Sequence, residues 1–334
     1  MNIINPNVEL LVQQVGLDGL YKQIELAGRT CYKSEDKITD DSAKAFVDRM
    51  IESKHYAMLE HGTVYLCAVD WDRNPLRHYW GNKYSRVKEV HLESVKEVHL
   101  ETEHCQSTTS YKYAYYVTTN LRVLVEHGWL DDLKYLCEPT EHHQRRITLK
   151  FTTNIGVTRE GNRHRVNSIA EESTRYCNYT KEKFDGEINI CKPSWIQDPT
   201  EIDVLKKRTN KDWAGIIRQI CDSELDGSGI FDNPIDYYGA SIAFANICYN
   251  NLIRLGWQPQ QAGEVLPLGT KSDIVYTAFT SDWKHWFDLR LFGVTGKPHP
   301  NMREIAVMAY NVLCENNLWQ TVYGEPVNIP QGTL

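Results

Sequence analysis

The chain has 334 residues, enough for one large domain or two ordinary ones. With 41% hydrophobic and 24% charged residues it is typical of a soluble globular protein, and its net charge of -7 disfavours nucleic acid as a bulk partner. The nine cysteines are odd in number and include no Cys-x-x-Cys pair, which indicates reduced thiols, no zinc site and a cytoplasmic setting. We expect no signal peptide and no membrane span, because no basic segment precedes an apolar core and no apolar run is long enough.

The first predicted elements are two helices and a strand. Residues 17–27 carry apolar residues at helical spacing, and Gly28 is expected to stop that helix. A second helix follows the N-cap candidates at 40–42 and has an apolar face within 46–51. The apolar run 64–69 predicts a buried strand. His61, just before it, would by itself be read as a hydrogen-bonded structural histidine.

Residues 72–145 contain a tandem eight-residue repeat, VKEVHLES at 87–94 and VKEVHLET at 95–102. Two copies are too few for a solenoid, and the alternation favours a strand or hairpin over a metal site built on its histidines. A tyrosine-rich run at 111–116 predicts a half-buried strand. Helices are predicted over 121–127 and 130–136, and His142-His143 is expected in an exposed connection. We expect the whole segment to pack onto the core rather than to form a separate domain.

The densest polar segment is NRHRVNSIAEESTRY at 162–176, with three Arg, one His, two Glu and two Ser. Arginine presents a planar fork of donors that matches phosphate or carboxylate oxygens. The alternating residues 147–157 predict a strand that ends at 158–161, so the segment is expected at a strand-to-helix junction, where a helix N-terminus would favour an anion. A salt-bridged, solvated helix face is the alternative.

The C-terminal part is predicted to be mostly helical. Helices are expected over 201–225 and 234–255, the second with small residues suited to close packing or a subunit interface. A short strand at 274–279 leads to a helix over 282–291, which Ser281 would cap and whose Trp and Phe residues are expected in the core. A final helix starts at 299, and a tail with Pro and Gly follows from 319.

Residues 163–176 also resemble a family signature. Their pattern is similar to the motif of the flavin-dependent thymidylate synthases: Arg-His-Arg, two residues, Ser, two residues, Glu, one residue, Ser, one residue and Arg-Tyr. Similar matches occur at Glu60-His61 with Thr63, at Val265-Leu266-Pro267-Leu268 and at Leu289-Arg290.

The chain departs from the family pattern at three positions and in one segment. Ala170 stands where relatives have Asn, Glu160 where they have Gln, and Gly263 where they have an Arg that contacts the nucleotide. The missing contact is expected either to come from elsewhere, with the nearby Lys271 as a candidate, or to be absent. Residues 72–145 form a family-atypical insertion.

The resemblance implies an α+β fold, with a central, mostly antiparallel sheet flanked by helices, in a single domain over 1–334. It implies methylation of dUMP to dTMP with 5,10-methylenetetrahydrofolate, FAD reduced by NADPH, no enzyme nucleophile on the pyrimidine, and a homotetramer with sites at subunit interfaces. The implied catalytic residue is Arg290. The implied substrate-binding residues are Glu160, Arg163, Glu171, Glu172, Ser173, Thr174 and Arg175. The implied cofactor-binding residues are His61, Thr63, Arg163, His164, Arg165, Glu171 and His285, and no metal ligands are expected.

Physical chemistry supports two of these roles. Without covalent attack, a fixed cation such as Arg290 must stabilise the negative charge that develops on the pyrimidine. Ser173 is expected to bind and orient substrate, since no base is evident beside it. Two other classes remain open: another enzyme that handles a phosphorylated nucleotide without flavin, and a nucleic-acid-binding module that uses Arg163, Arg165 and Arg175. The acidic net charge opposes the second.

Overall fold

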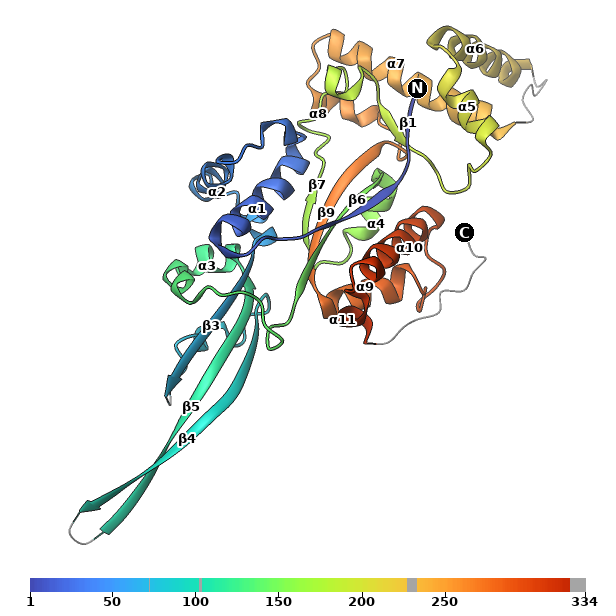
Figure 1. Ribbon diagram of the computed structural model, residues 1–334. Coiled ribbons are helices and arrows are strands. Elements are labelled where there is room, and N and C mark those ends of the chain that lie inside the picture. Colours follow the sequence, from blue (N-terminus) through green and yellow to red (C-terminus); the bar gives the residue numbers. More distant parts are fainter. Residues whose placement is uncertain (72, 102–103, 227–232, 325–334) are drawn as a thin grey trace.

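The computed structural model describes residues 1–71, 73–101, 104–226 and 233–324, and for 95–101, 104–108 and 224–226 it describes the backbone only. Thr102 of the tandem repeat and the tail beyond 324 lie outside the described residues. The architecture is α+β with antiparallel sheets flanked by helices, which confirms the predicted fold class (Figure 1).

The central sheet has four antiparallel strands in the order β2 (Asn7–Leu11), β6 (Arg146–Asn154), β9 (Lys271–Phe279) and β7 (Ser168–Glu171). All nine residues of β9 are buried, because helices cover both faces of the sheet. One face packs on α9 (Thr280–Arg290), α10 (Pro300–Glu315) and α11 (Trp319–Tyr323) through aromatic side chains such as Phe151 and Trp286. The other face packs on α1 (Gly16–Tyr32) and α2 (Ser42–Glu52).

A second sheet contains most of the insertion. Its order is β3 (Thr63–Trp71), β5 (His104–Asn120), β4 (Arg86–Glu101), and β3 pairs with β5 only as far as Trp71↔Lys112. Beyond that point β4 and β5 continue as a two-stranded ribbon that projects from the body (Figure 1). Residues 87–93 of the tandem repeat pair with β5 within the three-stranded part of this sheet, and residues 94–101 lie in the ribbon; both copies are strand, as their alternation predicts. At the root, buried residues including Leu76, Tyr79 and Val117 join the α1–α2 core. The expected packing of the insertion therefore holds for its root and not for the projecting ribbon.

A third hydrophobic cluster lies among α5 (Pro199–Lys207), α6 (Asn210–Asp226) and α7 (Pro234–Arg254), beside the parallel pair β1 (Asn2–Ile4) and β8 (Asn189–Cys191). The helix predicted over 201–225 is therefore two helices. Gly239 has a packing role, since a Cβ there would lie 2.1 Å from the ring of Trp213. The shorter helical elements are α3 (Leu121–His127), α4 (Ile155–Gly161), α8 (Pro259–Ala262), η1 (Glu35–Lys37), η2 (Tyr56–His61), η3 (Arg77–Tyr79), η4 (Leu130–Tyr135), η5 (Glu182–Phe184) and η6 (Gly263–Val265).

Three local predictions are wrong for identifiable reasons. Gly28 does not stop α1; it lies inside the helix. A glycine is needed there because a Cβ would come within 2.5 Å of the Phe46 ring. His143 is buried rather than exposed, with Nε2 3.1 Å from the carbonyl oxygen of Leu66. The tail from Trp319 begins with a helix, α11. Within the described ranges, no helix is both long and apolar enough to cross a bilayer.

Candidate functional site

The signature follows a short helix, not a strand. The Asn154 side chain accepts from the backbone N–H of Val157 at 2.9 Å, which ends β6 and begins α4. The signature therefore opens at the C-terminal end of α4, runs through a loop at 162–167 and enters β7. The expected strand-to-helix junction, with its helix N-terminus for an anion, is wrong.

Two sequence segments that resemble the family meet in one cavity of about 420 Å³, the signature pocket. Glu171 is held at its edge by hydrogen bonds from Thr158 Oγ1 at 2.6 Å and Asn162 Nδ2 at 3.0 Å. The pocket is lined by Cys31, Ile155, Arg159, Glu171, Glu172, Ser173, Thr174, Arg175, Gly263, Leu266 and Leu268. The predicted substrate residues 171–175 and the distant segment 263–268 thus form one site.

The cations of the signature pocket are Arg159 and Arg175, which are exposed. Neither forms an ion pair with a carboxylate among the described residues; Arg175 only lies 5.6 Å from the centre of the Tyr176 ring. Their guanidinium groups are therefore available to an anionic ligand. Gly263 lies beside them in the wall, with helical backbone angles that any residue adopts.

Lys271 is not available for the missing arginine contact. Its ammonium is buried and bonds Glu172 Oε2 at 2.8 Å and Asp273 Oδ2 at 2.6 Å. Lys33 completes this network by pairing with Asp273. Burial alone would raise the pKa of Asp273, but Lys271 and Lys33 outweigh it and hold that pKa far below its usual range. The suggestion of Lys271 as a nucleotide contact is wrong, because its charge is used inside the protein.

Arg290 belongs to a different cluster. Its Nε donates to His164 Nε2 at 3.0 Å, one terminal nitrogen donates to the Glu160 carbonyl oxygen at 3.1 Å, and the other pairs with the Glu160 carboxylate. Burial, followed by Arg290 and His285, lowers the pKa of His164 to about 4, so its ring is neutral and accepts the hydrogen bond. The exposed His285 lies 5.8 Å away between ring centres. None of these four residues lines the signature pocket.

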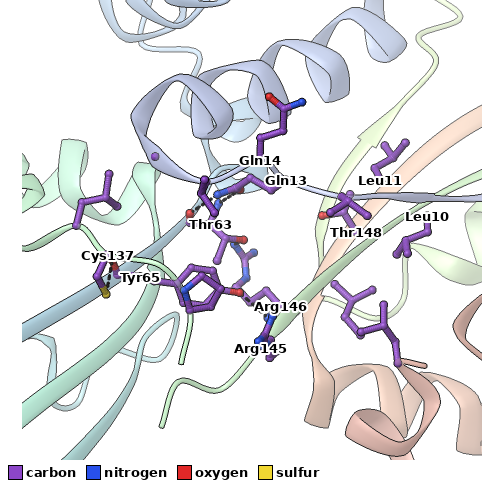
Figure 2. Close-up of a pocket in the computed structure, with 17 residues that line it drawn as sticks. Leu10, Leu11, Gln13, Gln14, Thr63, Tyr65, Cys137, Arg145, Arg146 and Thr148 are labelled. Carbon is purple, nitrogen blue, oxygen red and sulfur yellow. Dashed lines mark hydrogen bonds between the residues drawn. The ribbon is translucent and has the colours of Figure 1, made fainter. Parts of the chain in front are cut away.

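Arg146, which the sequence gave no reason to select, connects two further cavities. It donates to Glu60 O at 3.0 Å, to Thr63 Oγ1 at 3.2 Å and to Ser168 Oγ at 2.9 Å. Figure 2 shows it with Thr63 and Tyr65 in the smaller cavity, of about 160 Å³. The other cavity, of about 230 Å³, also contains Arg165. No motif distinguishes Arg146 from its neighbour Arg145; only the fold places it.

His61 lies beneath this region and is fully buried. Its Nδ1 is 2.9 Å from Thr277 Oγ1, while its Nε2 has no partner among the described atoms. Burial, then the charge of Arg146, lowers the pKa of His61 to about 3, so the ring is neutral. A direct flavin contact at His61 requires its covering residues to move.

Arg163 and Arg165 are exposed in the α4–β7 loop, with no carboxylate partner in the described part of the chain. Among the described residues no cluster of three or more His, Cys, Asp or Glu side chains could hold a metal ion. Cys31 does line the signature pocket, but burial, and then Glu171, raises the pKa of its thiol to about 11. It is therefore a protonated, weak nucleophile at neutral pH.

The chain is similar in structure to a UMP/dUMP methylase PolB from Streptomyces cacaoi bound with 5-Br dUMP, at 14% identity and a TM-score of 0.37, over 94% of this chain and 93% of that one. It is also similar to Thymidylate Synthase X from Helicobacter pylori with FAD and dUMP, at 12% identity and a TM-score of 0.37, over 95% and 99% of the two chains. No curated relative matches the sequence. The family model of the thymidylate synthase complementing proteins matches residues 124–316, which is more than half of the chain. The chain therefore belongs to the thymidylate synthase complementing proteins, the flavin-dependent thymidylate synthases.

Proposed function

We propose that this chain methylates dUMP at C5 to give dTMP, with 5,10-methylenetetrahydrofolate as the carbon donor and NADPH as the reductant of a bound FAD. The observation that carries this proposal is the convergence of residues 171–175 and 263–268 on one pocket, with two arginines that have no carboxylate partner among the described residues. Such a pocket favours a small phosphorylated ligand over a nucleic-acid backbone, because it is concave and the chain is acidic overall.

Within this pocket, Arg159 and Arg175 would hold the phosphate of dUMP. Ser173 lies between Glu171 and Arg175 in sequence, and its hydroxyl oxygen accepts from the backbone N–H of Arg175 at 3.3 Å. No general base contacts Ser173 among the described residues, so we assign it to orientation rather than to attack. Glu171, Glu172 and Thr174 complete the substrate wall.

The pyrimidine must become electron-rich at C5 without a covalent bond to the enzyme. The protonated thiol of Cys31 agrees with this requirement. Arg290 would supply a fixed positive charge to the ring oxygen and nitrogen that carry the developing negative charge. Its Nε and both terminal nitrogens already have protein acceptors, which hold the fork in one orientation and leave two of its five N–H groups for substrate.

The residues around Arg146 and Arg165 fit a flavin dinucleotide. Half-buried Arg146 has a buried Nε with no partner, and Arg163 and Arg165 are exposed and unpaired within the described residues. The residues that we propose to bind the cofactor are His61, Thr63, Arg163, His164, Arg165, Glu171 and His285. When bound, reduced FAD supplies the hydride that completes the methyl group.

Glu160 and Arg290 do not line the pocket that contains Ser173 and Arg175. We propose that each complete substrate site combines the pocket of one subunit with the Arg290 cluster of another, in a homotetramer. All of residues 1–334 are proposed to form one domain in each subunit.

The test starts with a visible spectrum of the purified protein, which should show bound flavin. Labelled dUMP should then be converted to dTMP only when the folate and NADPH are both present. Arg290→Ala should keep the flavin but lose about a hundred- to a thousandfold in rate, and Arg290→Lys should recover little, because a point charge cannot serve two ring atoms. Cys31→Ser should retain activity. A colourless protein that cannot take up FAD would refute the proposal.

A further inference from the structure

The root of the insertion forms part of a cavity with the signature. This cavity, which we call the root pocket, is lined on one side by Lys83, Tyr84, Arg86 and Asn120, all before the residues that match the family model. On the other side it is lined by Arg146, Arg165, Val166, Ser168, Ala278, Phe279 and Asp282, all within that match. The insertion therefore extends a surface that belongs to the signature.

The root pocket has an excess of positive charge. Four cations face one carboxylate, Asp282, which forms no ion pair among the described residues. The guanidinium groups of Arg86 and Arg146 lie 4.5 Å and 5.5 Å from the centre of the same ring, Phe279. Arg86 is fixed there by hydrogen bonds from one nitrogen to Lys83 O and Ser85 O, each 3.0 Å long.

Arg146 has the least favourable environment of the four. Its three acceptors, Glu60 O, Thr63 Oγ1 and Ser168 Oγ, are all uncharged, and its buried Nε has no partner. Burial lowers the pKa of Arg146 to about 10; Tyr65, Glu60 and Asp282 oppose this shift, and the charge of Arg86 adds to it. Within the described residues no carboxylate lies within ion-pair distance of this partly buried guanidinium, so an anion in the root pocket would offset part of its desolvation cost.

We propose that Lys83 and Arg86, supplied by the insertion, join Arg146 and Arg165 to hold the diphosphate of a dinucleotide in the root pocket. The inference rests on the proposed function for its ligand, FAD, because Arg165 belongs to the proposed flavin set; NADPH carries the same diphosphate chemistry. The cavity of about 230 Å³ is below the ~300–1,000 Å³ of a whole-ligand pocket, so it suits the diphosphate alone.

The experiment compares binding of FAD, FMN, riboflavin and NADPH to the flavin-free full chain and to Arg86→Gln and Lys83→Gln, by fluorescence or calorimetry at two salt concentrations. Loss of one phosphate contact should weaken FAD binding about tenfold or more, leave riboflavin unchanged and reduce the salt dependence. Arg77→Gln and Lys88→Gln are matched controls, since both residues lie in the insertion, are exposed and do not line the pocket. A ribbon shortened by replacing residues 94–111 with Asn-Gly, next to the paired Glu93 and Lys112, should also bind FAD as the parent does.

Each outcome decides between the two proposals. A weaker NADPH affinity with unchanged FAD affinity would assign the diphosphate to NADPH. Equal losses for FAD and riboflavin, or no loss for either dinucleotide, would overturn the inference while leaving the proposed function intact. If the parent binds no flavin, the proposed function fails, and inorganic pyrophosphate then tests the pocket directly. Parent binding of pyrophosphate that Arg86→Gln loses supports the inference, and equal binding by both refutes it.

Discussion

The phosphate contacts of the signature pocket can be tested by exchanging its cations. Arg159→Gln and Arg175→Gln should each weaken dUMP binding, because each removes a guanidinium that has no carboxylate partner in the described part of the protein. Neither substitution breaks an ion pair within the described part of the protein, so each should reduce the affinity for dUMP rather than the stability of the fold. A charge-assisted hydrogen bond contributes about 1.5–3 kcal/mol, which corresponds to about 10- to 150-fold in affinity. Both arginines are exposed, so screening favours the lower part of that range.

Gly263→Arg supplies the complementary change. Gly263 has helical angles (φ -59°), and a Cβ there would lie 3.7 Å from Thr174 O and 3.8 Å from Leu266 Cδ1, which is ordinary contact. An arginine therefore fits, and it should tighten dUMP binding and restore much of what Arg159→Gln loses. The assay is calorimetric titration with dUMP and with deoxyuridine, which lacks the phosphate. If the three variants keep the parent's preference for dUMP over deoxyuridine, the phosphate is bound elsewhere.

Three further predictions concern the surroundings of the site. Glu160→Gln removes a negative charge beside Arg290 and should raise the rate of dTMP formation by up to about tenfold with unchanged flavin content; a slower enzyme would show that the carboxylate itself is needed. The pKa of His61, about 3 in the folded protein against ~6.5 unfolded, means that stability is complete above pH 6.5 and falls as pH drops towards 3. The loss is about 2–3 kcal/mol at pH 4.5, and urea titrations of a His61→Asn variant should show a shallower pH slope. Lys271→Met should cost ~3–5 kcal/mol in the same assay by leaving Glu172 buried without its main partner, and adding Glu172→Gln should recover part of it; a neutral single variant would contradict the network.

The sequence predicted those parts of the site that depend on local patterns. The density of polar residues and the family resemblance identified residues 163–176, and the resemblance identified 263–268. The fold brings 171–175 and 263–268 to one pocket. The end of the strand was harder to predict. Residues 147–157 alternate like a strand, yet a helix begins within them, capped by the Asn154 side chain. The alternation of apolar residues does not reveal that a single capping hydrogen bond ends the strand and begins a helix.

What sequence reasoning missed depends on contacts between distant segments. Lys271 looked like a free cation because the pairing of β7 with β9, which brings Glu172 to it, is not visible in the spacing; its other partner, Asp273, lies two residues further along β9. Arg146 was missed for the same reason, since its value as a site residue comes from Phe279 and Ser168. Gly28 was read as a helix stop, although the Phe46 ring is what requires a glycine there.

The distribution of cations over the molecule carries a further argument. Acidic residues outnumber basic ones, 44 to 37, so an arginine that merely needed a counter-ion would find one easily. The buried carboxylates Glu172 and Asp273 are instead neutralised by lysines, while Arg159, Arg163, Arg165 and Arg175 have no carboxylate among the described residues. A lysine suits a fixed internal pair as a compact point charge, and an arginine fork suits phosphate oxygens. Around the site, lysines therefore neutralise the buried carboxylates Glu172 and Asp273, and the unpaired arginines remain for ligand recognition. Elsewhere an arginine also serves a buried internal pair, Arg29 with Glu25. Raising the salt concentration should therefore weaken binding of dUMP and FAD well before it affects unfolding, since buried pairs are screened far less than exposed charges.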